Sequence, residues 1–166
     1  MSGVEKLEKL LNYRFKNPKL CERALTHKSF ATDDNERLEF LGDAVLGLLV
    51  SDLIYQRFPD FTEGQLSMVK SHLVSKKFLH RLASHLHLEK HIRFNRENPK
   101  KSQAVLANTM EAVIGAIFLD SNYDTTKSCI GSLFLEHLDD INPTAVKNPK
   151  NTLQEFTQQK SIELPT

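Results

Sequence analysis

Three acidic residues recur at helical spacing in the segment NERLEFLGDAVL, residues 35–46. Glu36, Glu39 and Asp43 occupy positions i, i+3 and i+7, so on a helix they project from one face within about two turns. Like charges at this spacing repel each other, at a cost of about a few tenths of a kcal/mol per pair. A divalent cation such as Mg²⁺, which prefers oxygen ligands, would turn that repulsion into attraction. The alternative is a solvated acidic face, with Glu36 placed favourably near the N-terminus of its helix.

A second polar pair interrupts the apolar segment VLANTMEAVIGAIFLD. Asn108 and Glu111 stand at i and i+3 in a helix that otherwise consists of core-forming residues, and a buried charge there needs a partner. Two hypotheses are open at this point. Glu111 forms an ion pair with a basic residue of another helix, such as Arg37, or it joins Glu39 and Asp43 in an oxygen-rich metal site.

Apolar residues recur at helical spacing along almost the whole chain. Helices are predicted over residues 4–11, 20–25, 35–57, 66–86, 102–122 and 124–138. Asp33, Asp34 and Asn35 are all acceptable N-caps for the third of these helices. No segment alternates apolar and polar residues for long enough to predict a strand. The predicted fold class is therefore all-α, with the acidic triplet and the Asn108–Glu111 pair on two different apolar helices.

The bulk composition narrows the class of protein. The 166 residues suit one domain, or one domain plus an appendage. The 22 basic and 21 acidic residues give a formal net charge of +1, which is too even to indicate a general polyanion binder. Two cysteines far apart favour reduced thiols over a disulfide. The longest apolar stretch (44–55) is shorter than the about 20 residues of a membrane span, and no signal peptide is recognisable, so we expect a cytoplasmic protein without membrane association.

Four segments together resemble the catalytic domain of the ribonuclease III family. They are ALTHKSF (24–30), NERLEFLGDAVLGLLVSDLIYQRFP (35–59), TEGQLSMVKSHLVS (62–75) and LANTMEAVIGAIFLD (106–120). The resemblance implies an all-helical catalytic domain, residues 1–141, that forms a homodimer and cleaves double-stranded RNA in RNA processing, including that of rRNA. It implies Mg²⁺ as the cofactor, with Mn²⁺ as a substitute and no small-molecule cofactor. The implied products carry 5′-phosphate and 3′-hydroxyl ends with short 3′ overhangs.

The residues after this domain have a different character. The stretch DDINPTAVKNPKN contains two prolines, which indicates a linker at residues 142–150. The segment NTLQEFTQQKSIELPT, residues 151–166, predicts an amphipathic helix that is too short to form its own core. It resembles the first helix of the double-stranded-RNA-binding domain of bacterial family members, so we expect a truncated domain here.

The resemblance also implies roles for individual residues. Glu39, Asp43 and Glu111 match the metal ligands of the family by motif position, and Asn108 occupies the place of a fourth ligand. Glu36 matches the first acid of the motif and completes the expected catalytic set with Glu39, Asp43 and Glu111.

Further matches concern the edge of the site and the dimer. Glu36 and Glu63 resemble the acids that complete the RNA-cutting valley near the dimer interface. Phe40, Leu41 and Gly42 match a hydrophobic segment that helps to form the dimer contact.

Several basic residues are candidates for contacts with RNA phosphates. They are Lys76, Lys77, Lys100 and Lys101, with Arg93 and Arg96 beside the last two. The alternative for each of them is ordinary solvated charge. Because few bases are clustered, we expect weak intrinsic RNA affinity that falls steeply with salt.

One residue departs from the family pattern, because Asn108 stands where the family usually has Asp. Asn108 keeps one carbonyl oxygen as a neutral ligand and loses a negative charge. It indicates a tolerated natural variant with weaker metal affinity, an engineered change, or a drift toward a non-catalytic RNA-binding or ribosome-associated module. We favour the active variant, since Glu39, Asp43 and Glu111 are all present.

Overall fold

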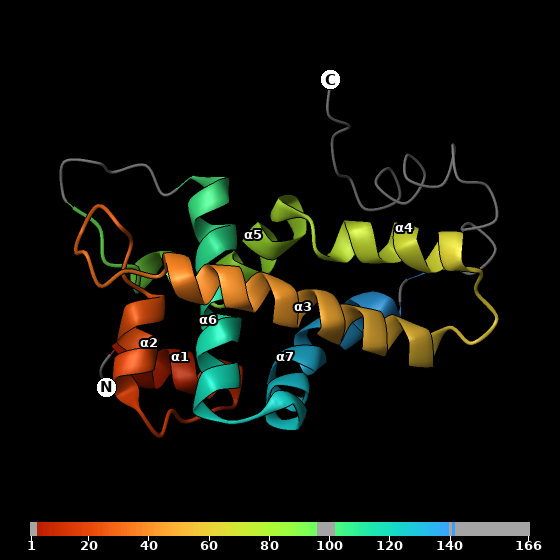
Figure 1. Cartoon of the computed structure of the whole chain (residues 1–166), viewed down its shortest axis with the longest axis horizontal. Coiled ribbons are helices and arrows are strands. Elements are labelled where there is room, and N and C mark those ends of the chain that lie inside the picture. The colour runs from red at the N-terminus through yellow and green to blue at the C-terminus, as the bar shows by residue number, and fades with distance from the viewer. Residues whose placement is uncertain (1–2, 96–101, 140, 142–166) are drawn as a thin grey trace.

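A computed structural model describes residues 3–95, 102–139 and 141. Figure 1 shows that these residues form an all-helical arrangement. Its elements are α1 (Gly3–Leu11), α2 (Pro18–Ala24), α3 (Glu36–Arg57), α4 (Glu63–Leu73), α5 (Lys76–His85), the short 3-10 helix η1 (Leu88–Lys90), α6 (Gln103–Asp120) and α7 (Tyr123–Leu138). The prediction of an all-α fold is confirmed.

Little else in the described part of the chain is regular structure. An isolated β-bridge joins Thr26 to Arg93 and ties the loop before α3 to the segment after η1. The predicted linker (142–150) and the helix expected after it (151–166) lie outside the described residues.

The core is organised around α6, which α3 crosses in the most extensive helix–helix contact of the fold (Figure 1). Every residue of α6 from Thr109 to Ile117 is buried. Within the described residues, α6 is the one helix long and apolar enough to cross a membrane by length and composition, and 61% of it is buried inside the protein. A helix that is apolar on all sides and buried in this way is typical of a protein core.

The helical pattern over residues 66–86 is divided into two helices, which corrects the prediction of one continuous helix. α4 ends at Leu73 and α5 begins at Lys76. Between them, the Ser75 hydroxyl accepts a hydrogen bond from the backbone N–H of Phe78 at 3.2 Å and caps the new helix. The break allows α5 to pack against α6, and it places Lys76 at the first position of a helix.

The start of α3 is fixed to α2 by polar contacts. Asn35 is the N-cap residue, as predicted, but its buried side chain donates a hydrogen bond to the backbone oxygen of Ala24 at 3.2 Å instead of capping the helix. The carboxylate of Asp34 accepts a hydrogen bond from the backbone N–H of Glu36 at 2.9 Å. These bonds hold the first turn of α3, and with it the first of the acidic residues.

Candidate active site

Residues of α3, α5 and α6 line an open cavity of about 500 Å³, here called the acidic cavity. Its lining consists of Glu36, Glu39, Phe40, Asp43, Val74, Lys76 and Glu111. The structure thus brings together the four acids that the sequence analysis selected. Three come from one face of α3, as their spacing predicted, and Glu111 comes from the helix that crosses it.

Two glycines permit this close crossing of α3 and α6. A Cβ atom at Gly42 would overlap the backbone oxygen of Glu111, and a Cβ atom at Gly115 would overlap the backbone oxygen of Leu38. Only the absence of a side chain at both positions lets the two backbones touch. Gly42 therefore positions Glu111 beside Glu39 and Asp43.

Glu111 is the most unusual acid of the cavity, because only 6% of it is exposed. Burial raises its pKa to about 7, against an opposing effect from the Lys76 ammonium, and the negative charges of Asp43 and Glu39 raise it further. Burial also raises the pKa of Glu39, again opposed by Lys76. The acidic cavity therefore carries repulsion that a further cation would relieve.

Lys76 is the main cation of the acidic cavity. Its ammonium donates a hydrogen bond to the side-chain oxygen of Asn108, and Asn108 is also hydrogen-bonded to Glu39. The hypothesis of a basic partner for Glu111 from another helix is not supported for Arg37, which is exposed. The positive charge that acts on Glu111 is that of Lys76 on α5. The sequence predicted that Lys76 contacts RNA phosphates and gave no sign that it lies among the acids.

The donor set suits a hard divalent cation. Three carboxylates and one amide oxygen are the ligands that Mg²⁺ prefers, and the negative charges of Asp43 and Glu39 add to the effect of burial on the pKa of Glu111. In the part of the chain that the structure describes, no three Asp, Glu, His or Cys side chains converge closely enough to form a metal site. The acids therefore need side-chain movement to act as common ligands.

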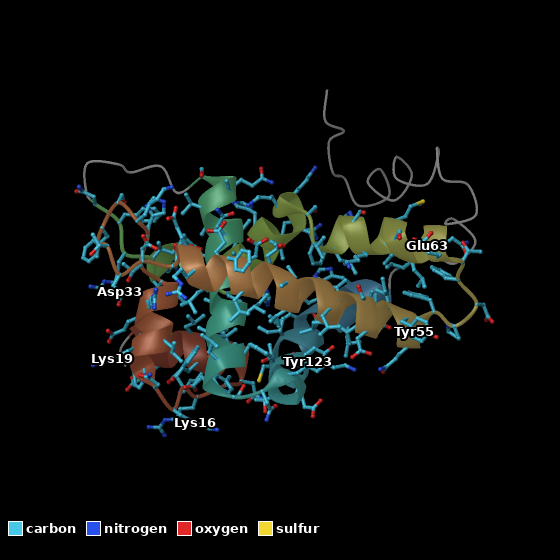
Figure 2. The ribbon with its side chains drawn as sticks, viewed as in Figure 1. Lys16, Lys19, Asp33, Tyr55, Glu63 and Tyr123 are labelled. Carbon is cyan, nitrogen blue, oxygen red and sulfur yellow. The ribbon has the colours of Figure 1, made fainter. Side chains whose placement is uncertain are left out.

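The remaining predicted residues lie outside the acidic cavity. Glu63 is the first residue of α4, where its carboxylate accepts a hydrogen bond from the Ser67 hydroxyl at 2.7 Å. Figure 2 places Glu63 at the end of the molecule that carries Tyr55, far from Asp33 and the start of α3. Lys77 is exposed on α5 next to Lys76.

The other basic candidates divide by position. Arg93 is exposed, and its guanidinium lies 4.6 Å from the ring centre of Phe30. Arg96, Lys100 and Lys101 lie outside the described residues.

The three residues assigned to the dimer contact have different environments. Phe40 is 82% exposed. Leu41 is half-buried, and Gly42 is buried against α6. Gly42 is thus already covered by α6 of its own chain, whereas Phe40 presents a large apolar side chain to solvent.

Lys28 is a residue of the site that sequence reasoning missed. Its ammonium donates a hydrogen bond to the Glu36 carboxylate at 2.8 Å, in an ion pair exposed to solvent. The contact joins the ALTHKSF segment to the acidic cavity. Its position eight residues before Glu36, outside any helix, gave no periodic signal.

Similarity to known proteins covers nearly the whole chain. Residues 17–138 match the family described as Ribonuclease-III-like. The chain belongs to the ribonuclease III family. Ribonuclease 3 of Albidiferax ferrireducens is 43% identical over 99% of this chain and 74% of its own length. Ribonuclease 3 of Aromatoleum aromaticum is 39% identical over the entire chain and 76% of its own length.

Solved structures of ribonuclease III proteins have the same fold. The nuclease domain of ribonuclease III from Campylobacter jejuni is 37% identical, with a TM-score of 0.79 over 86% of this chain and 100% of that one. Dicer from Pichia stipitis is 31% identical, with a TM-score of 0.60 over 75% of this chain and 57% of its own. The fold is therefore that of a ribonuclease III nuclease domain, and the protein is a ribonuclease III-type endoribonuclease.

Proposed function

We propose that the protein is a Mg²⁺-dependent enzyme that cuts double-stranded RNA during RNA processing in the cytoplasm. Its products carry 5′-phosphate and 3′-hydroxyl ends with short 3′ overhangs. The observation that supports this proposal most strongly is the acidic cavity, in which the buried Glu111 faces Glu39 and Asp43. Such a concentration of charge is typical of a site that works with a divalent cation.

Four residues would hold the metal ion. Glu39, Asp43 and Glu111 would supply carboxylate oxygens, and Asn108 its amide oxygen. When bound, Mg²⁺ or Mn²⁺ would activate water for attack on phosphorus and stabilise negative charge on the leaving 3′-oxygen. Glu111, on the most buried helix, would fix the position of the ion, and Glu36 would face the RNA at the edge of the cavity.

RNA would bind mainly through its phosphates and its shape. Lys77 follows the cavity residue Lys76 in α5, and Lys100 and Lys101 precede α6 in the sequence; these lysines would contact phosphates. The segment 151–166 would begin a double-stranded-RNA-binding domain, joined to the catalytic domain by the linker 142–150.

The dimer would form along α3. Phe40, Leu48 and Tyr55 are exposed apolar residues of this helix, at 82%, 59% and 72%. Their spacing of eight and seven residues places them on one stripe of the helix surface. In a two-fold dimer the same stripe serves both copies. If the two α3 helices pair in antiparallel fashion, the partner subunit's Glu63 lies near the acidic cavity, which is the cross-dimer role expected for this residue.

Replacing both Phe40 and Leu48 with aspartate is expected to weaken the dimer by at least about thirtyfold, because two large apolar contacts become charges in a desolvated interface. Sedimentation velocity over a concentration series measures this change. Leu119→Asp on α6, where the parent residue is 54% exposed, is the matched control and is expected to leave the dimer intact. An unchanged dimer in the double variant would show that the α3 stripe is not the interface.

Replacing Asn108 with aspartate is expected to lower the Mg²⁺ concentration for half-maximal cleavage by about three- to tenfold, because a fourth negative charge strengthens metal binding. Cleavage of a labelled RNA duplex over a Mg²⁺ titration measures this effect. The wild type must show measurable cleavage before the change. If Asn108→Asp instead creates activity from none, the alternative of a non-catalytic RNA-binding or ribosome-associated module is correct for the natural chain.

A further inference from the structure

Lys76 occupies an unexpected position for a lysine. It lines the acidic cavity with Glu39, Asp43 and Glu111, and its ammonium is bonded to the amide oxygen of Asn108. These are the oxygens that the proposed function assigns to the metal ion. An ammonium group at this place competes with any other cation for the same oxygen atoms.

The local fold holds Lys76 there. It is the first residue of α5, directly after the Ser75 cap, and α5 is held in place by its packing on α6 and by its buried residues Phe78 and Leu79. A positive charge in the first turn of a helix is unfavourable, because the helix dipole already places partial positive charge there. The first turn of α5 nevertheless contains Lys76 and Lys77 and no acid. The negative charges of the cavity compensate for Lys76 at this position.

The charges of the cavity support the same role. Four acids line the cavity, and Glu36 among them forms an ion pair with Lys28. Glu39, Asp43 and Glu111 contribute three further negative charges when ionised, Lys76 offsets one of them, and Asn108 contributes none. Lys76 also opposes the effect of burial on the pKa of both Glu39 and Glu111.

We propose that Lys76 is a built-in counter-ion of the acidic cavity, which competes with divalent metal for the oxygens of Asn108, Glu39 and Glu111. The inference rests on the proposed function, because it takes these residues to be the metal ligands. Binding of the metal would require the ammonium to leave Asn108. Lys76 would thus lower the affinity of the cavity for metal and stabilise the fold around it when no metal is bound.

Calorimetric titration of the full chain with Mn²⁺, without RNA and at fixed pH and low salt, tests this inference. Lys76→Gln is expected to bind Mn²⁺ at least about tenfold more tightly than the wild type, because one repelling charge is removed. Lys76→Arg retains the charge and is expected to stay within about twofold of the wild type. Lys77→Gln removes one positive charge outside the cavity lining. Its affinity for Mn²⁺ is also expected to stay within about twofold of that of the wild type. Glu111→Gln is expected to lose Mn²⁺ binding.

Thermal unfolding provides a second readout that does not depend on activity. In EDTA, Lys76→Gln is expected to unfold at a lower temperature than the wild type, and Mn²⁺ is expected to raise its unfolding temperature by more than it raises that of the wild type. If Lys76→Gln binds Mn²⁺ no more tightly than the wild type while Glu111→Gln abolishes binding, the inference is wrong and the proposed metal site stands; that outcome would leave Lys76 as a phosphate contact. If neither the wild type nor Lys76→Gln binds Mn²⁺, both the inference and the proposed metal site are wrong.

Discussion

Replacing Glu111 with glutamine is expected to reduce Mg²⁺-dependent cleavage of duplex RNA by at least about a thousandfold, which corresponds to about 4 kcal/mol of transition-state stabilisation. Glutamine has the shape of glutamate and keeps one oxygen, but it removes the charge of the most buried acid of the cavity. Single-turnover cleavage at saturating Mg²⁺ measures the loss.

The same substitution is expected to stabilise the metal-free fold at high pH. Glu111 has a pKa of about 7 in the folded state and the ordinary carboxyl value of 4.5 when unfolded. The folded state therefore binds the proton more tightly, so the wild type loses stability as pH rises from about 4.5 to about 7, by up to about 3 kcal/mol. Glu111→Gln lacks this loss.

Urea unfolding in EDTA at pH 5 and at pH 8 tests the direction of this change in stability with pH. The variant and the wild type are expected to be similar at pH 5, with the variant more stable at pH 8. A variant that is less stable at pH 8 would show that the Glu111 carboxylate is satisfied without metal, contrary to the proposed site.

Replacing Gly42 with alanine is expected to destabilise the fold by at least about 3 kcal/mol and to lower the unfolding temperature by about 10 °C. The added methyl group overlaps the backbone of α6 at Glu111, and a backbone atom cannot rotate away as a side chain can. The two helices must separate, which also moves Glu111 away from Glu39 and Asp43. Metal affinity and activity are therefore expected to fall together with stability.

Gly47→Ala is the matched control on the same helix. A Cβ atom there would meet only the flexible end of Lys70, at 3.9 Å. Because alanine favours helix more than glycine does, this substitution is expected to stabilise the protein by about 0.5–1 kcal/mol. Thermal unfolding of both variants separates the two effects. Equal stability of the two variants would contradict the close approach of α3 and α6.

The helices could be predicted from the sequence because their apolar residues follow a strong 3.6-residue period. The break between α4 and α5 was not, since Val74 and Ser75 continue the apolar pattern without Gly or Pro. The Ser75 hydroxyl donates a hydrogen bond to the backbone oxygen of His72 at the end of α4 and accepts one from the backbone N–H of Phe78 at the start of α5. Serine is common inside helices as well, so its presence does not predict a break. Tertiary packing of α5 on α6 decides between the two outcomes.

Site residues were predictable where their spacing alone puts them on one face of a helix. They were less predictable where they are brought together by the crossing of two helices. The spacing of Glu36, Glu39 and Asp43 was sufficient to place them together. For Glu111 the sequence pattern left two hypotheses open, and the motif resemblance favoured the one that joins it to Glu39 and Asp43. Lys76 was missed as a cavity residue because its position depends on the helix break at Ser75 and on the crossing of α5 with α6. Gly42 was assigned only to the dimer for the same reason, since its contact with α6 is tertiary.

Incubation of a long labelled RNA duplex with the purified chain at low salt, in Mg²⁺ and separately in EDTA, tests the central proposal most directly. Short duplex products with 5′-phosphate and 3′-hydroxyl ends are expected in Mg²⁺ alone, and Glu111→Gln is expected to abolish them. An uncut duplex with a folded, dimeric protein in either Mg²⁺ or Mn²⁺ would contradict the account. Cleavage that persists in EDTA or in Glu111→Gln would contradict it equally.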